Sequence, residues 1–278
     1  MSKGIRIALI VCAVLAVVGL ALTAAGWMMG GSLNFSLDWK NRKINTADES
    51  LTFGTLTPEN CTTLELSAAT ADITVQRGDG WALEYALYEE PEITQKNGTL
   101  TVKSEEHSAV NFIGVALDSR KAPHITETVP ADAQLDQVLI ATATGDVWLS
   151  ELEADTVSAA CATGDIRVQD VTAGRLTVTA NTGDVILDNA VCATEAEIES
   201  NTGDVRVSGG SFPAGLECET NTGDVHLSLP AGDYALDLEA GVGDVIVNGR
   251  DQGKSHDTAG SIPVSAETNT GDVIVTIA

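Results

Sequence analysis

Aromatic and basic residues are the two classes that this 278-residue chain has least of. Phe, Trp and Tyr make up 4% of the residues, too few to line the aromatic pocket of a typical globular enzyme or to offer many stacking platforms for sugars. Lys and Arg number 15 against 40 Asp and Glu, which gives a formal net charge of −25. Because a phosphate backbone is bound through cations, this balance excludes nucleic acid as a partner.

Familiar signatures of catalysis and metal binding are also missing. The sequence has no glycine-rich phosphate loop, no nucleophile elbow and no zinc-ligand spacing. Its histidines stand in unrelated places, which indicates no acid–base or metal cluster: His107, His124, His226 and His256. Four of the five cysteines are expected to be free thiols in the core or in turns: Cys61, Cys161, Cys192 and Cys218. We therefore predict no catalytic residue and no bound cofactor.

A charge-free apolar run extends from Ile7 to Met29. About 20 apolar residues at 1.5 Å each cross the hydrocarbon core of a bilayer, so we predict a membrane anchor within residues 1–31. Lys3 and Arg6 precede the run and favour a cytoplasmic N-terminus. The prediction is a single-pass protein of the cell membrane with its remaining residues extracytoplasmic. A cleaved signal peptide is the alternative, although the run is longer than the apolar region of such peptides.

An internal repeat dominates the rest of the chain. The string Thr-Gly-Asp-Val, or a close variant, recurs with glycine spacings of 19, 19, 20, 20, 20 and 28 residues. Its glycines are Gly145, Gly164, Gly183, Gly203, Gly223, Gly243 and Gly271. Apolar residues lie seven and five positions before each glycine and two and four positions after it. This alternation predicts two short strands per repeat, each with one buried face, joined by a tight turn at the glycine.

A unit of about 20 residues cannot bury its apolar face alone, whereas stacked units can. We therefore predict an all-β fold, a right-handed β-solenoid of about 20-residue rungs preceded by the transmembrane helix. The rungs are expected to stack in chain order, so that Asp272 lies at the end of the stack. A β-sandwich is the alternative, but its strands and loops vary more in length than these copies do.

The sequence divides into four parts on this interpretation. Residues 1–31 are the cytoplasmic tip and anchor, 32–59 a linker or stalk, 60–130 an irregular β lead-in and N-terminal cap, and 131–278 the acidic solenoid. Within the lead-in, Thr70–Ile73 resembles a degenerate repeat, and Asn97-Gly98 predicts a hairpin turn. The longest glycine spacing contains an insertion within Asn248–Ser261, expected to project as a loop.

The aspartate that follows each glycine is the one constellation with potential for chemistry. Stacked rungs would place these carboxylates in a row about 5 Å apart. The row comprises Asp72, Asp146, Asp165, Asp184, Asp204, Asp224, Asp244 and Asp272. Ca²⁺ prefers such oxygen ligands, but we favour the alternative that each carboxylate accepts backbone amides in its own turn. Asparagines two residues before four of the glycines are expected to form an amide ladder: Asn181, Asn201, Asn221 and Asn269.

The anchor, the lead-in that ends in Val129-Pro130 and the Thr-Gly-Asp-Val rungs together resemble bacterial β-strand-repeat proteins of unknown function. These proteins are labelled as adhesin candidates and are similar to head-GIN adhesin-like domains. The resemblance covers residues 60–278. It implies a solenoid outside a bacterial membrane and suggests adhesion or envelope sensing, with an envelope protein or glycan as partner. It supplies no catalytic residues.

Two functions follow from these observations. The preferred one is a non-catalytic binding, adhesion or envelope-sensing module. The alternative is a surface polysaccharide lyase or hydrolase on a β-helix, which needs two carboxyl groups in a substrate cleft, one with a raised pKa. Aromatic residues beside an asymmetric pair of carboxylates would favour the enzyme, and a smooth repeated face would favour the binding module.

Overall fold

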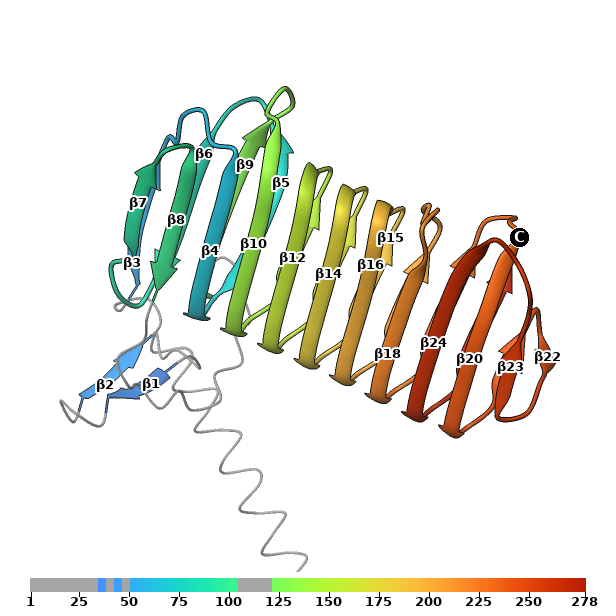
Figure 1. Ribbon diagram of the computed structural model, residues 1–278. Helices are drawn as coiled ribbons and strands as arrows, with labels where there is room; N and C mark the ends of the chain where they lie inside the picture. The colour runs from blue at the N-terminus through green and yellow to red at the C-terminus, as the bar shows by residue number, and fades with distance from the viewer. Residues whose placement is uncertain (1–34, 39–42, 47–50, 105–121) are drawn as a thin grey trace, which may run out of the picture. The chain divides into compact units, whose positions relative to one another are not determined.

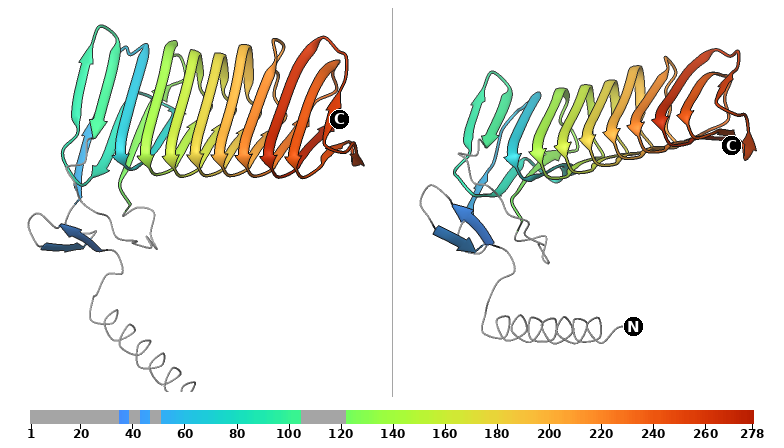
Figure 2. Two further views of the ribbon diagram at one scale, coloured as in Figure 1. Left: turned by 60° about the horizontal axis from the view of Figure 1, so that its bottom comes forward. Right: turned by 90° about the horizontal axis from the view of Figure 1, so that it is seen from below.

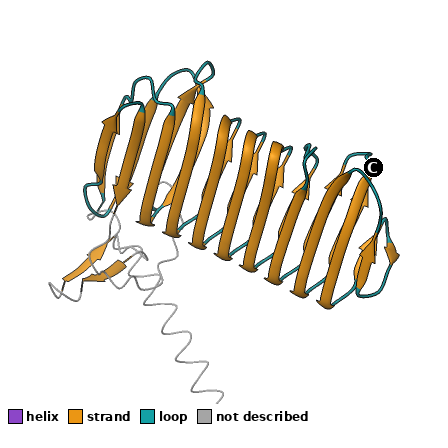
Figure 3. Cartoon of the chain, viewed as in Figure 1, coloured by secondary structure: helices purple, strands orange, loops and turns teal. Residues whose placement is uncertain are grey.

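The computed structural model describes residues 35–38, 43–46, 51–104 and 122–278. It contains two units. The first includes an antiparallel pair, β1 (Phe35–Asp38) and β2 (Lys43–Thr46). The described residues of the second unit are 51–104 and 122–278, and they are built from strands and loops (Figure 3). The predicted anchor lies outside the described residues, which contain no helix long and apolar enough to cross a membrane.

Two long sheets lie face to face along the second unit (Figures 1 and 2). The eleven-stranded sheet contains, in spatial order, β23 (Ser255–Asp257), β20 (Tyr234–Val242), β24 (Ile262–Thr270), β18 (Leu216–Thr222), β16 (Val191–Thr202), β14 (Thr172–Thr182), β12 (Glu153–Thr163), β10 (Leu135–Thr144), β4 (Thr63–Thr70), β8 (Thr99–Ser104) and β7 (Glu92–Lys96). The twelve-stranded sheet contains β22 (Arg250–Asp251), β21 (Val245–Val247), β25 (Val273–Ile277), β19 (Val225–Leu229), β17 (Val205–Ser208), β15 (Val185–Asp188), β13 (Ile166–Gln169), β11 (Val147–Ser150), β5 (Asp72–Gly78), β9 (His124–Pro130), β6 (Ala82–Leu87) and β3 (Thr52–Leu56).

Each rung places a long strand in the first sheet and a short strand in the second, with a Gly-Asp corner between them. The rung of Gly183, for example, runs from β14 through the corner into β15. Successive rungs pair in parallel and in register, as Leu176 does with Ala196 and Val185 with Val205. The predicted all-β, repeat-based fold is confirmed in this form: two long, mostly parallel sheets that stack as a β-solenoid.

The core lies between the two sheets. The inward positions expected from the alternation are all buried, except Val247, which is half-buried. The residues between them face outward, as Trp148 and Arg167 do. A charge at an inward position would therefore lie between neighbouring rungs with no water to solvate it.

The last two rungs depart from chain order. The rung of Gly271 lies between those of Gly223 and Gly243, because β24 pairs with both β18 and β20. The expectation that Asp272 ends the stack is thus wrong, since Asp244 does. The insertion does not project either: β22 and β23 pair antiparallel with β21 and β20. Its strands pair with the edge strands of the last rung, whose backbone groups would otherwise lack strand partners.

The N-terminal end of the stack is irregular. The degenerate repeat forms a true rung, with β4 and β5 parallel to β10 and β11. Beyond it, β8 and β7 form the predicted hairpin, whose turn residues Asn97 and Gly98 have φ of 52° and 81°. In the other sheet, β9, β6 and β3 follow in turn. The range expected to be a linker therefore contains a strand of the stack, Thr52–Leu56.

Candidate functional site

The corner glycines stack directly on one another. Their φ values run from 137° at Gly145 to 148° at Gly223, a conformation that residues with a side chain rarely adopt. A Cβ added to Gly164 would also overlap the carbonyl oxygen of Gly145 in the next rung. Both constraints require glycine, and they explain the repeat better than the turn alone does.

The aspartates beside these glycines form one continuous ladder. In each step, the backbone N–H of one aspartate donates to Oδ1 of the aspartate in the neighbouring rung. Asp165 donates to Asp146 at 2.8 Å, and Asp184 donates to Asp165 at 2.9 Å. The complete order is Asp72, Asp146, Asp165, Asp184, Asp204, Asp224, Asp272 and Asp244. At the far end Lys254 replaces the missing amide, with its Nζ 3.4 Å from Asp244 Oδ1.

The predicted row of aspartates is present, but the prediction that each carboxylate bonds within its own turn is wrong. The carboxylates accept amides of the adjacent rung and not of their own turn, because parallel in-register strands bring those amides within reach. At Asp72, the pKa is raised by burial and by the neighbouring Asp146, against a lowering effect of the Asp146 amide. Among the described residues, no three acidic, histidine or cysteine side chains are grouped to hold a metal ion. Calcium binding by the row stays a hypothesis.

Two further polar rows follow the same corner. The Asn ladder forms as expected, from Asn201 to Asn181, Asn221 to Asn201 and Asn269 to Asn221, over 3.0 to 3.3 Å. A buried row that sequence reasoning missed lies three residues before the glycines. Its hydroxyl or thiol groups donate to the carbonyl oxygen at the neighbouring corner: Thr142, Cys161, Ser200, Thr220 and Thr268. The recurrence of small polar residues at this inward position was the available signal.

The four described cysteines are free and buried, as expected. Burial raises the pKa of the Cys161 thiol, and three nearby aspartates raise it further. Burial also raises the pKa of Cys218. These thiols are therefore uncharged at neutral pH and act as core residues, not as nucleophiles.

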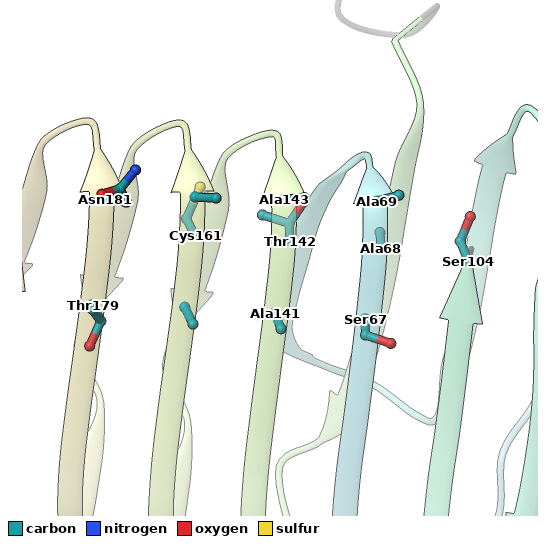
Figure 4. Close-up of a pocket in the computed structure, with 12 residues that line it drawn as sticks. Ser67, Ala68, Ala69, Ser104, Ala141, Thr142, Ala143, Cys161, Thr179 and Asn181 are labelled. Atoms are coloured by element: carbon teal, nitrogen blue, oxygen red, sulfur yellow. The ribbon is translucent and has the colours of Figure 1, made fainter. Parts of the chain in front are cut away.

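A shallow groove of about 680 Å³ follows the outer face of the eleven-stranded sheet near the corners. Figure 4 shows that its lining comes from β8, β4, β10, β12 and β14, and that small side chains such as Ala69 and Ala143 predominate. Farther along the same face the small residues give way to carboxylates. Glu199 lies beside Glu197, Glu217 and Glu219, and burial together with these neighbours raises its pKa.

A second hollow of about 600 Å³ lies at the opposite corner of the first regular rungs. Arg77 occupies it and donates to the carbonyl oxygens of Glu151 and Pro130 at 2.8 and 2.6 Å. Four acidic residues are in its lining: Asp132, Asp136, Glu153 and Asp155. The lining contains no aromatic side chain, so the feature that would favour a polysaccharide enzyme is not met in this hollow.

One acidic side chain has a strongly perturbed environment. Glu127 points into the core from β9, with an exposed fraction of 0% and no hydrogen-bond partner for either carboxylate oxygen. Its strand neighbours are Val75 and Leu83. Burial raises its pKa to about 8. It is a protonated acid at neutral pH, but substrate has no access to it. The alternation Ile125-Thr-Glu-Thr-Val129 was the signal available in the sequence for its inward position.

A row of outward side chains along the twelve-stranded sheet is the other feature that was not predicted from the sequence. Trp148 of β11 is 50% exposed, and the Arg167 guanidinium of β13 lies over its ring, 5.8 Å from the centroid. Thr74 of β5 is the neighbour of Trp148 on the other side. The row continues through Ile186, Arg206 and His226. Register prediction from the repeat would have paired Trp148 with Arg167, one rung apart.

Comparison with known proteins identifies the family. The family model Toastrack DUF4097 matches residues 61–275, so the chain belongs to this family. No curated protein matches.

Solved structures of bacterial proteins match most of this chain. One, described as a "putative adhesin" from Bacteroides fragilis, has a TM-score of 0.52 at 16% identity, covering 82% of this chain and 97% of that one. A second, described as a "putative adhesin" from Parabacteroides distasonis, has a TM-score of 0.44 at 13% identity, with 84% and 98% covered. A third, a "putative cell adhesion protein" from Clostridium sporogenes, has a TM-score of 0.40 at 13% identity, with 82% and 100% covered.

Proposed function

We propose that this member of the toastrack family is a membrane-anchored, extracytoplasmic binding module for adhesion or envelope sensing, built on a right-handed β-solenoid. Residues 7–29 would anchor it, with the N-terminus in the cytoplasm. Its partner would be a protein or glycan of a cell envelope. The adhesion label of the solved structure with the similar fold agrees with this proposal.

The observation that carries the proposal is that the repeated Asp and Asn side chains form hydrogen bonds between rungs. The aspartate ladder links all the regular rungs, and the asparagine ladder links four of them, through side-chain hydrogen bonds between rungs. They stiffen the stack and leave two long, regular outer faces. A rigid extended surface suits recognition, because little conformational entropy is lost when a partner binds.

The enzyme alternative has weaker support. A glycosidase needs an acid of raised pKa that reaches its substrate, whereas Glu127 is sealed in the core. Asp72 and Glu199 also have raised pKa values, but each belongs to a row of like residues and neither lies beside an aromatic side chain in a described groove. We therefore propose that the protein has no catalytic activity.

Adhesion is tested with bacterial cells that produce the full chain and matched cells that do not. Both are applied to surfaces coated with envelope polysaccharide or envelope protein, and retained cells are counted. We expect retention only with the full chain. A variant with Val185→Asp, which places a charge at a fully buried position, should lose retention, while the exposed Ser208→Asp should keep it. Equal retention of all four strains would contradict adhesion, and release of reducing sugar ends from the coat would favour the enzyme.

The topology is tested on the same cells. Protease added outside should remove the solenoid, and mass spectrometry of untreated protein should recover peptides from residues 1–31. A mature N-terminus near Ala25 would show instead that the apolar run is a cleaved signal peptide.

A further inference from the structure

We propose that the exposed face around Trp148 is a binding site for a neutral glycan. The inference rests on the proposed binding function and names its ligand class. The site is the tryptophan patch, formed by Trp148, Thr74, Gln76, Asp146, Ser150, Arg167 and Gln169.

The centre of the patch is an aromatic ring at a position that the neighbouring rungs fill with other residue types. Trp148 sits at an outward position of β11, where other rungs carry Arg167, Ile186 or Arg206. Half of its surface is exposed to solvent. Arg167 lies over the ring from the next rung. The neighbour in the preceding rung is only Thr74, whose small side chain cannot cover an indole. A solvent-exposed aromatic ring is the kind of group on which the C–H face of a sugar ring stacks.

Hydrogen-bonding side chains surround this ring on the same face of the sheet. Ser150 pairs in register with Gln76 on one side and Gln169 on the other, two positions along from Trp148. Gln76 and Gln169 are exposed. On the other flank the aspartate ladder uses Oδ1 of Asp146. Amide N–H and hydroxyl groups of this kind donate to vicinal sugar hydroxyls, and amide, hydroxyl and carboxylate oxygens accept from them.

Charge selects against an acidic ligand. Residues 131–278 carry 25 acidic and five basic residues, a net charge of −20. Asp146 and the neighbouring aspartates of the ladder flank Trp148, and Arg167 is the one arginine in the patch. A uronate or sulfated glycan would meet repulsion from the adjacent aspartate row, and Arg206, farther along the outward row, is already paired with Asp204. A neutral glycan keeps its stacking and hydrogen bonds. The parallel rungs also repeat at about 4.8 Å, so a linear chain of sugars can extend along the row toward Ile186.

The test uses the full-length protein in a detergent without a sugar headgroup. Neutral hexasaccharides of glucose, mannose and N-acetylglucosamine are titrated calorimetrically, with hexagalacturonate as the acidic counterpart. We expect at least one neutral hexasaccharide to bind and to shift the Trp emission. Trp148→Ala should weaken that binding by about tenfold, and Trp148→Tyr should keep most of it because a smaller aromatic face remains. Val242→Ala, at an exposed apolar position near the far end of the stack and outside the row, is the matched control.

Three results would overturn the inference: binding by none of the neutral sugars, equal binding by Trp148→Ala, or tighter binding of hexagalacturonate. Unfolding curves of each variant establish that the stack is intact. Cell adhesion separates this failure from failure of the proposed function. If the wild-type protein binds no sugar and cells with Trp148→Ala still adhere normally, the glycan site is refuted but adhesion is not. Absence of adhesion by wild-type cells refutes the wider function.

Discussion

Glu127 should make the stability of the N-terminal end fall as pH rises. Its carboxyl pKa is about 8 in the folded protein against an ordinary value of 4.5. Between these two values the unfolded chain loses the proton and the folded chain keeps it. Stability contributed by the protonated form is therefore complete below pH 4.5 and is lost progressively up to pH 8.

The magnitude follows from the same two values. Each pKa unit corresponds to 1.36 kcal/mol. A pH of 7 lies 2.5 units above the ordinary pKa of 4.5. Ionisation of Glu127 in the unfolded chain therefore lowers the free energy of unfolding by about 3 kcal/mol at pH 7. The full effect, reached at pH 8, is about 5 kcal/mol. Since both carboxylate oxygens lie in the core without a partner, this carboxyl is not screened by solvent.

The assay compares wild type with Glu127→Gln, which keeps the shape of the side chain but does not titrate. Urea unfolding is followed by circular dichroism from pH 4 to 9 at constant ionic strength. The free energy of unfolding of wild type is subtracted from that of the variant at each pH. This difference removes the contribution of the other acidic groups, which both proteins share. The stability of the variant relative to wild type should rise by about 3 kcal/mol from pH 4.5 to 7 and level off above pH 8. Glu127→Met should show the same pH dependence. A difference that does not change with pH would refute a buried, protonated Glu127.

Three other results are expected. Gly183→Ala should cost several kcal/mol in urea unfolding, because its Cβ overlaps the Gly164 carbonyl, whereas Gly249→Ala, with φ of 72° and no atom within 4 Å, should cost only about 1 kcal/mol; equal costs would contradict the role of the overlap. Cysteines at Thr222 and Thr270, which pair in register, should form a disulfide on oxidation, while cysteines at Thr222 and Val242, two rungs apart, should not; the reverse would restore stacking in chain order. Millimolar Ca²⁺ should raise the melting temperature no more than a monovalent salt of equal ionic strength, and a larger, ion-specific rise would identify the aspartate row as a calcium site.

Much of the fold could be predicted because each rung repeats one local rule. Alternation of apolar residues around each glycine fixes which side chains are buried, and Val185 and Val205 show the result. The order of the last two rungs could not be read in the same way. The rungs of Gly243 and Gly271 present the same pattern, so either can pair with the rung of Gly223. The 28-residue spacing was the one sign that the chain passes over a rung.

The candidate sites were less predictable for a different reason. A carboxylate in a tight turn can accept an amide of its own turn or of the next rung, and the sequence does not distinguish the two. Trp148 and Arg167 lie 19 residues apart in the chain, so their contact depends on register between rungs. Glu127 was visible as an acid at an inward position, but its lack of any partner depends on the whole cap.

The displaced order of the last rungs has a consequence for how the protein reaches its final form. During synthesis residues 234–247 are made before residues 262–277, yet the later segment lies between the earlier one and the rung of Gly223. While the final strands are still to arrive, β20 can occupy the place of β24, because both offer the same apolar pattern to β18. Completion of the stack then requires release of that mispaired rung. The rate at which the last residues emerge, and not only the stability of the product, would decide how many molecules close correctly.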